Sequence, residues 1–368
     1  MNRSIADHKA RQETITLQKE SQLPEWKKFL SESITSAEEL AKFLDVDKQE
    51  VKEVTSVYPM KINRYFLGLI KQKNDALWRQ SIPSIEELKQ NVCVEDPLHE
   101  EQQSPVKGLV HRYPDRVLLL VSNNCAMFCR FCTRKRKIGH SETIKRENII
   151  EGIEYIRKHK EIRDVLLSGG DPLLLDDKEL DWILGKIRAI KHVEIIRIGT
   201  RVPCSLPMRI TKELCEVLKK YHPLFVNMHF NHSQEITEET RKACNLLAEA
   251  GIPLGNQTVL LKGVNDSGEI IAKLNKELLK MRVRPYYLYQ ADLVKGTNHF
   301  RTKTELGIKI IESLRGHISG LAVPHFAIDA PGGGGKITIA PNYVLEKTDK
   351  KIILRNYENK CFEYPEPE

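Results

Sequence analysis

Short apolar segments that recur along the chain constrain its fold more than any other feature. Six of them start near the following residues: Val117, Val165, Val193, Leu224, Asn256 and Val283. From the second onward they are spaced by about 30 residues, the length of one β-α unit. Apolar residues at helical spacing lie between them, as at Leu180, Ile183 and Ile187. The alternation predicts a parallel sheet covered by helices, either doubly wound or closed toward a barrel.

Two signals for helix starts lie in the first hundred residues. Ser36 and Ser84 each precede a glutamate by three positions, as in the capping box. We therefore expect a helical N-terminal region over 1–105 and an α/β core over 106–340. A short tail over 341–368 ends in the acidic, proline-rich sequence FEYPEPE.

Composition excludes several classes of protein. Hydrophobic residues make up 40% of the 368 residues, enough for a sizeable core, and the net charge of +8 is a modest excess. No zinc-finger spacing or RNP motif accompanies that charge, so we expect no nucleic-acid partner. The longest aliphatic runs, such as 117–121, fall far short of the roughly 18 apolar residues of a membrane-spanning helix. The polar start has no apolar secretion segment, so we expect a cytoplasmic protein without a membrane partner.

Three of the eight cysteines form a compact C-x₃-C-x₂-C loop directly after the first predicted strand. They are Cys125, Cys129 and Cys132, and the other five are scattered along the chain. Thiolates are soft ligands that suit iron–sulfur clusters or zinc. No fourth Cys or His lies at a conventional zinc spacing, so zinc is not expected there. Three thiolates on a four-iron cluster would instead leave one iron open to a cofactor.

Polar residues gather at the predicted strand ends, at 168–171, 199–201, 229–231 and 289–292. In both α/β architectures the ligand binds at the carboxyl ends of the strands. The cysteine loop follows a strand in the same way. We therefore expect these segments to meet at one rim of the sheet.

A glycine-rich segment ends in Lys336. A phosphate-binding P-loop reads G-x₄-G-K-[ST], but here Ala330 stands at its first position and Ile337 at its last. A lysine on a glycine loop can instead form a Schiff base with pyridoxal phosphate. An ordinary surface turn is the alternative.

The chain resembles the radical S-adenosylmethionine (SAM) superfamily in its cysteine loop and, within it, the lysine 2,3-aminomutase family. The second resemblance covers most of residues 95–345 and rests on these motifs, in order: HRYPDR, CRFCTRKR, LSGGDPL, RIGTRVP, NQTVLLKGVND, RPYYLYQADL and DAPGGGGK. It implies a partial (β/α)₆ barrel. It also implies a [4Fe–4S] cluster held by the three cysteines, with S-adenosylmethionine bound at its open iron.

The same resemblance implies roles for individual residues. The following are expected to contact S-adenosylmethionine, although backbone-satisfied strand ends are the alternative for several of them: Ser168, Gly169, Gly170, Asp171, His229 and Gln257. Pyridoxal phosphate would bind Lys336 covalently and contact the following: Arg112, Tyr113, Arg116 and Tyr289. Two of these are arginines, which bind phosphate through paired donors but which also fit a solvated basic face.

Substrate identity rests on charge. The resemblance implies that Arg134 binds the α-carboxylate of an amino acid, and that Asp292 and Asp329 bind a distal ammonium. Two acids select a cationic side chain, because a buried ammonium must be paired. The resemblance therefore implies transfer of the α-amino group of L-lysine to C3, giving β-lysine. Glutamate is disfavoured, whereas arginine or a lysine within a protein stays open.

A rival reading from another class is a non-catalytic iron–sulfur electron carrier, which has no use for the lysine or the acidic pair. The aminomutase reading requires an external reductant of the flavodoxin or ferredoxin type. Relatives with a longer tail bind zinc between subunits through cysteines, but here Ser267 stands at one such position and the tail holds only Cys361. Zinc is therefore not expected, and the oligomeric state, a homo-oligomer included, stays open.

Overall fold

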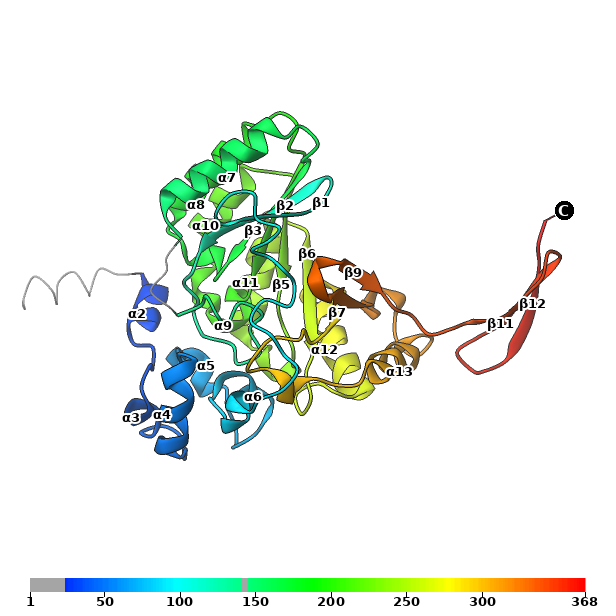
Figure 1. Cartoon of the computed structure of the whole chain (residues 1–368), viewed down its shortest axis with the longest axis horizontal. Coiled ribbons are helices and arrows are strands. Elements are labelled where there is room, and N and C mark those ends of the chain that lie inside the picture. Colours follow the sequence, from blue (N-terminus) through cyan, green and yellow to red (C-terminus); the bar gives the residue numbers. More distant parts are fainter. Residues whose placement is uncertain (1–23, 140–143, 368) are drawn as a thin grey trace, which may run out of the picture.

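The chain forms an α/β barrel, and the computed structural model describes its residues 24–139 and 144–367. Nine strands follow one another in sequence order in one sheet, and β2 to β8 run parallel (Figure 1). The edge strands β1 and β9 pair antiparallel with β2 and β8. The bounds are β1 (Leu109–Tyr113), β2 (Arg116–Ser122), β3 (Asp164–Gly169), β4 (Ile195–Thr200), β5 (Leu224–Met228), β6 (Leu254–Leu260), β7 (Val283–Gln290), β8 (His325–Ala330) and β9 (Gly335–Thr338).

Six strand–helix units, from β2 to α13, build the barrel, as the apolar periodicity and the family resemblance predict. Each helix buries one apolar stripe against the sheet; on α8, Leu180, Ile183 and Ile187 are fully buried. Burying such a side chain contributes roughly 1.5–3 kcal/mol. The helices of this part are α7 (Arg146–Lys158), α8 (Asp177–Arg188), α9 (Val202–Ser205), α10 (Lys212–Lys219), α11 (Glu238–Glu249), α12 (Gly268–Lys280) and α13 (Thr304–Leu314).

The six predicted strands correspond to β2–β7, although the third begins at Ile195 rather than near Val193. Three further strands, β1, β8 and β9, were not expected from the apolar pattern. They are short and carry the polar residues of the HRYPDR and DAPGGGGK motifs, so their apolar content is too low to stand out. Within the described ranges no backbone ladder joins β1 to β9, which leaves the barrel partial.

The N-terminal region is helical, as predicted, although its first 23 residues lie outside the described part of the chain. It has a small apolar core of its own, which includes Leu40, Ile62 and Trp78. The capping box at Ser84 is complete, whereas at the other site the Glu39 carboxylate accepts from the Thr35 N–H. The helices are α2 (Glu25–Ser31), α3 (Ala37–Leu40), α4 (Lys48–Val57), α5 (Arg64–Gly68), α6 (Ala76–Ser81) and the 3₁₀ turn η1 (Ile85–Leu88).

Residues 89–105 carry no helix and run back along the barrel. The Val94 N–H donates to the Leu293 carbonyl at 2.9 Å, and Arg112 donates to the Leu98 carbonyl at 2.7 Å. This stretch therefore brings its polar side chains to the strand ends. Short 3₁₀ turns complete the core: η2 (Pro172–Leu174), η3 (Pro207–Arg209), η4 (Ser233–Glu235), η5 (Asn298–Phe300), η6 (Gly320–Ala322) and η7 (Pro331–Gly333).

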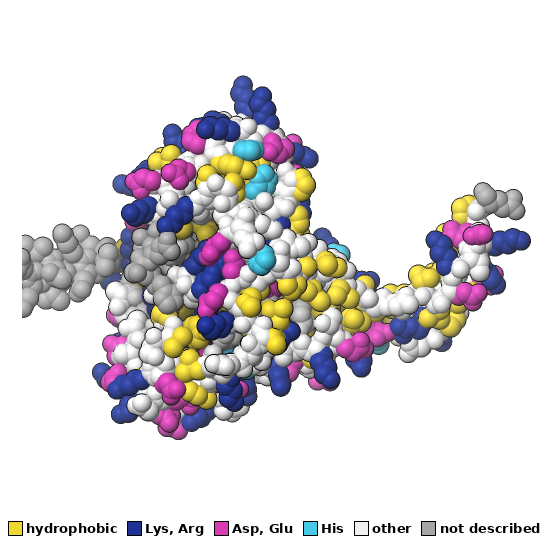
Figure 2. All heavy atoms as spheres, in the orientation of Figure 1, with side chains coloured by type: hydrophobic (Ala, Val, Ile, Leu, Met, Phe, Trp, Pro, Cys, Tyr) yellow, Lys and Arg dark blue, Asp and Glu magenta, His cyan; other side chains and the backbone are white. Residues whose placement is uncertain are grey.

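The tail forms a separate three-stranded antiparallel sheet that projects from the barrel (Figure 1). Its strands are β10 (Val344–Lys347), β11 (Lys351–Arg355) and β12 (Cys361–Pro365). An ion pair of 2.6 Å between Arg355 and Glu312 ties its base to α13. Apolar side chains lie exposed along this arm (Figure 2): Val344, Leu345, Tyr357, Phe362 and Tyr364. Every helix in the described ranges is too short or too polar to span a lipid bilayer.

Candidate active site

One cavity of about 660 Å³ lies inside the barrel and runs from the starts of β2 and β3, where Arg116 and Asp164 line it, to the carboxyl ends of the parallel strands. All the residues that the sequence predicts for the site line this cavity. Most of them lie at or just after strand ends, as the strand-end argument requires, whereas Arg116 is the first residue of β2. They are Cys125, Cys129, Cys132, Ser168, Gly169, Gly170, Asp171, His229, Gln257, Arg112, Tyr113, Arg116, Tyr289, Lys336, Arg134, Asp292 and Asp329.

The cysteine loop follows β2 and is held by the N-terminal region. The Phe128 N–H donates to the Lys61 carbonyl at 2.9 Å, and Arg130 N–H donates to Gln80 at 2.9 Å. Burial raises the pKa of Cys132 to about 11 and that of Cys125 well above its usual value, and each thiol is further disfavoured as an anion by its cysteine neighbours. Three half-buried thiols in one loop fit a bound cationic centre, because metal binding displaces their protons.

Close backbone approach explains the two glycines at the end of β3. A Cβ on Gly169, whose φ is +131°, would lie 2.2 Å from the Ser122 carbonyl oxygen. A Cβ on Gly170 would lie 2.4 Å from the Asn124 carbonyl oxygen. These glycines therefore let β3 pass directly beside the start of the cysteine loop.

Asp171 is engaged by the protein itself. Its carboxylate accepts hydrogen bonds from the Thr200 hydroxyl at 2.7 Å and from the backbone N–H of Arg201 at 2.7 Å and of Val202 at 3.1 Å. Burial raises its pKa to about 6 despite these bonds. The side chain thus fixes the turn after β4, and contact with a methionyl ammonium stays a prediction.

Two orphaned polar atoms point to a ligand that the protein alone does not provide. The Nε2 atom of His229 and the hydroxyl of Tyr289 are buried and have no hydrogen-bond partner among the described residues. Burial, with Arg201 nearby, lowers the pKa of His229 to about 3, so its imidazole is neutral. Buried polar groups are normally satisfied, so both atoms fit a bound cofactor.

The predicted cofactor lysine and one predicted substrate acid face each other. Asp329 on β8 and Lys336 on β9 are directly opposed in the antiparallel pair, and Lys336 Nζ lies 3.2 Å from Asp329 Oδ2. Arg112 holds the other carboxylate oxygen at 3.0 Å. Lys336 Nζ also lies 5.7 Å from the centre of the Tyr289 ring. The Asp329 carboxylate is therefore shared between two cations.

The second predicted acid, Asp292, forms no ion pair with a described residue, and its charge is compensated less than that of Asp329. Burial raises the pKa of Asp292 to about 7; the Asp329 charge adds to the rise, whereas Lys336 and Arg112 reduce it. No hydrogen bond from a described residue contributes to lowering it. A carboxyl group in this state gains strongly from a cation placed beside it.

Arg134 lies against Glu100 in a two-pronged ion pair, with N–O distances of 2.7 and 3.1 Å. Its remaining terminal nitrogen donates to the Ser168 hydroxyl at 3.2 Å. Both charged side chains are largely buried, at 14% and 10% exposed. A substrate carboxylate at Arg134 must therefore share the guanidinium with Glu100.

The two candidate phosphate arginines differ. The guanidinium of Arg112 donates to Gln103, Asp329 and the Leu98 carbonyl, so each of its three nitrogens already makes one hydrogen bond. The side chain of Arg116 is 40% exposed and stacks on the Tyr113 ring at 4.1 Å. Arg116 also pairs with Asp115 at 2.9 Å, so each arginine has one carboxylate partner and Arg116 differs in being more exposed.

Sequence reasoning missed three polar residues of this site. Glu100 and Gln103 come from the helix-free stretch before β1, and their partners lie far away in the sequence. Arg201 stood in the polar segment after β4, but nothing in the sequence showed that its guanidinium would reach Cys129. The charge run at 95–101 was the available signal for Glu100.

Comparisons with known proteins support the assignment of the site to one class. A sequence model of the radical SAM superfamily matches residues 119–274, from β2 into α12. Enzymes of this class use a [4Fe–4S] cluster and S-adenosylmethionine. Among solved structures the chain is similar to Streptococcus suis SuiB bound to S-adenosylmethionine, with 17% identity, a TM-score of 0.45, and coverage of 60% of this chain and 51% of that one.

Similar sequences define the family more narrowly. A model described as lysine-2,3-aminomutase matches residues 311–368. The chain is 54% identical over 348 residues to an L-lysine 2,3-aminomutase of Methanococcus maripaludis, covering 92% of this chain and 80% of the relative. It is 51% identical over 350 residues to that of Clostridium subterminale (93% and 84%). It is 46% identical over 337 residues to a glutamate 2,3-aminomutase of Clostridioides difficile (90% and 80%).

The chain belongs to the lysine 2,3-aminomutase family of radical SAM enzymes. It is accordingly an isomerase that moves an amino group within its substrate. This excludes the rival reading as a non-catalytic electron carrier.

Proposed function

We propose that the substrate is free L-lysine, that the product is β-lysine, and that pyridoxal phosphate binds Lys336. The observation that carries this proposal is the acidic pair, Asp292 and Asp329, which faces Lys336 in the cavity that also holds the three cysteines. An ammonium beside two carboxylates would compensate a charge at Asp292 that Lys336 and Arg112 offset only in part. The same pair disfavours glutamate, although a glutamate 2,3-aminomutase is among the relatives.

Each end of lysine then has a partner of opposite charge. The guanidinium of Arg134 would bind the α-carboxylate through paired donors, held in orientation by Glu100. The distal ammonium would take the place of Lys336 beside Asp329. When bound, S-adenosylmethionine on the reduced cluster supplies a hydrogen-abstracting radical, and pyridoxal phosphate supplies a carbonyl for the migrating amino group. The side chains of the protein would position the substrate relative to both cofactors, since a misplacement of 1 Å can cost about 100-fold in rate.

Product analysis tests the substrate. The anaerobically reconstituted enzyme, with both cofactors and dithionite, is incubated separately with lysine, arginine, glutamate and a lysine-bearing protein. We expect β-lysine from the first and no β-amino acid from glutamate. Turnover of glutamate in preference to lysine would contradict the charge argument, and turnover of arginine or of the protein alone would replace the substrate.

Borohydride trapping tests the cofactor assignment separately. Reduction followed by peptide mass spectrometry should place a pyridoxyl group on Lys336, and a Lys336→Arg variant should carry none. An adduct on another lysine would remove the assignment. The external reductant is proposed to be a one-electron donor of the flavodoxin or ferredoxin type, and reduction by each purified donor in place of dithionite would test it.

A further inference from the structure

Arg201 is a buried arginine that touches a predicted cluster ligand and has no role in the functions described so far. Its Nη1 atom lies 2.7 Å from the Sγ atom of Cys129. Its side chain is 9% exposed. The backbone N–H of Arg201 donates to Asp171 at 2.7 Å, which fixes the start of the side chain at the end of β4.

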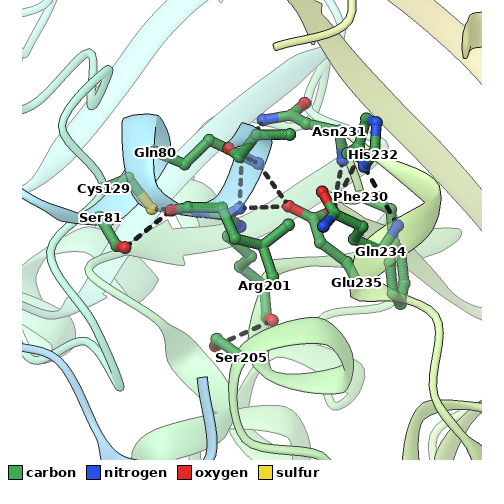
Figure 3. Close-up of polar contacts among 12 residues, drawn as sticks. Gln80, Ser81, Cys129, Arg201, Ser205, Phe230, Asn231, His232, Gln234 and Glu235 are labelled. Carbon is green, nitrogen blue, oxygen red and sulfur yellow. Dashed lines mark hydrogen bonds and ion pairs between the residues drawn. The ribbon is translucent and has the colours of Figure 1, made fainter. Parts of the chain in front are cut away.

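The opposite terminal nitrogen is held by two acceptors. Nη2 of Arg201 donates to Gln80 Oε1 at 2.7 Å and to Glu235 Oε1 at 2.9 Å. The guanidinium carbon lies 5.5 and 5.1 Å from the ring centres of Phe66 and Phe131. Arg201 therefore contacts acceptors on one side and the sulfur on the other, as Figure 3 shows.

The two acceptors are themselves fixed. Glu235 Oε2 accepts from the backbone N–H of Asn231 at 2.6 Å and of His232 at 3.2 Å. Gln80 Nε2 donates to Glu235 at 2.9 Å, and the Asn231 amide donates to Gln80 Oε1 at 2.9 Å (Figure 3). Gln80 comes from α6 of the N-terminal region, whereas the others follow β4 and β5. Turning the guanidinium away from the sulfur would break several buried hydrogen bonds at once.

The positive charge of Arg201, rather than the negative charge of Glu235, contacts the Cys129 sulfur. Arg201 and the fully buried Glu235 form an ion pair of 2.9 Å through Nη2, whereas Nη1, the other terminal nitrogen, contacts the sulfur directly at 2.7 Å. Net charge and hydrogen bonds to the sulfur ligands set the reduction potential of an iron–sulfur cluster. A fixed cation and an N–H donor stabilise the reduced cluster, which carries one more negative charge.

We propose that Arg201 is a positioning residue that acts through Cys129 to raise the reduction potential of the [4Fe–4S] cluster. The step concerned is the uptake of one electron from the external donor, which converts the 2+ cluster to the 1+ cluster; no bond breaks and no proton is needed. The inference rests on Cys129 as a cluster ligand. It also gives the N-terminal region a function, because Gln80 helps to aim the guanidinium.

The test measures the cluster rather than turnover. Wild type, Arg201→Lys and Arg201→Met are reconstituted anaerobically, and iron and sulfide contents are determined. The midpoint potential is then measured from the electron paramagnetic resonance signal at controlled potentials, without S-adenosylmethionine. We expect Arg201→Met to disfavour reduction at least tenfold, which is about 59 mV for a one-electron couple, and Arg201→Lys to disfavour it less.

Arg209→Met is the matched control. Arg209 is also fully buried, but its guanidinium binds Asp177 and the carbonyls of Leu173 and Leu175. We expect the Arg209→Met variant to be less stable than wild type but to keep the wild-type midpoint potential of the cluster. A shift equal to that of Arg201→Met would show that any buried-arginine loss has this effect and would overturn the proposal.

Two further variants extend the test, and the first, which keeps Arg201, leaves the proposal falsifiable if Arg201→Met assembles no cluster. Gln80→Ala leaves the arginine in place and should lower the potential by a smaller amount, because the guanidinium is less well aimed. The double variant Arg201→Met with Glu235→Gln removes both charges and should stay below wild type, because the N–H donor to sulfur is still missing. A wild-type potential in either variant would refute the proposal, whereas a wild-type protein without a four-iron cluster would refute the ligand assignment instead.

Discussion

Replacing Asp292 by asparagine should make the substrate-free protein more stable in a pH-dependent way. Burial raises the pKa of Asp292 from 3.8 to about 7. At about 1.4 kcal/mol per pKa unit, ionising it in the folded chain costs roughly 4 kcal/mol. This cost is absent below pH 3.8, the ordinary pKa of the group. It grows as the pH rises toward 7, the pKa in the folded chain, and is complete above pH 7. Asparagine cannot ionise, so Asp292→Asn avoids the whole cost.

The stability gain can be converted to a melting temperature. The unfolding entropy is about 2.1 cal/mol/K per residue, or about 0.8 kcal/mol/K for a chain of this length. At pH 8, the full ionisation cost thus corresponds to a melting temperature about 5 °C higher for Asp292→Asn than for wild type. Roughly half of it arises between pH 5.5 and pH 8, so the difference between variant and wild type should grow by about 2 to 3 °C over that interval.

Thermal unfolding of the substrate-free protein at the two pH values provides the assay. Asp45→Asn is the control, because the Asp45 side chain is 99% exposed and its substitution should change little at either pH. Added lysine should stabilise wild type more than Asp292→Asn. A variant that gains no more than the control between pH 5.5 and pH 8 would refute the burial argument.

Three other perturbations test separate parts of the site. The KM for lysine should fall as the pH rises through 7, because Asp292 must be ionised to bind an ammonium; a flat steady-state profile would contradict this. Glu100→Gln should lower stability by about 3 kcal/mol, seen in thermal unfolding, because Arg134 loses a buried partner; an unchanged melting temperature would count against it. Gly170→Ala should reduce soluble yield and iron uptake, because its Cβ would meet backbone at 2.4 Å, whereas Gly68→Ala, with open space around it, should not.

The barrel could be predicted because its signal is periodic. Strands β2–β7 and helices such as α8 bury apolar residues at the spacing of their secondary structure, so the pattern is visible in the sequence alone. The edge strands β1, β8 and β9 carry polar, functional residues instead. Their place depends on hydrogen bonds to a neighbouring strand, which no local apolar pattern reveals.

The residue types at the site were predictable, but their pairings were not. All the predicted residues line the cavity; most do so because strand ends converge whatever the side chains are, whereas Arg116 lines it from the start of β2. The ion pair between Glu100 and Arg134, however, joins a helix-free stretch to the cysteine loop, and its formation depends on the fold. Likewise, Asp171 was expected to contact S-adenosylmethionine, but its carboxylate accepts hydrogen bonds from the turn after β4. Whether such a polar side chain binds the protein or a ligand depends on the three-dimensional positions of its neighbours, which the sequence does not reveal.

In the part of the chain that the structure describes, side-chain contacts, rather than a backbone ladder, connect the two edges of the barrel sheet near β1 and β9. Arg112 and Tyr113 on β1 reach from one edge to the other, the first to Asp329 and the second accepting the backbone N–H of Lys336 at 2.9 Å. A few such contacts hold less firmly than a full strand ladder. Amide protons of β9 should therefore exchange with solvent sooner than those of the central strands, so the barrel should open most readily where the proposed cofactor lysine lies.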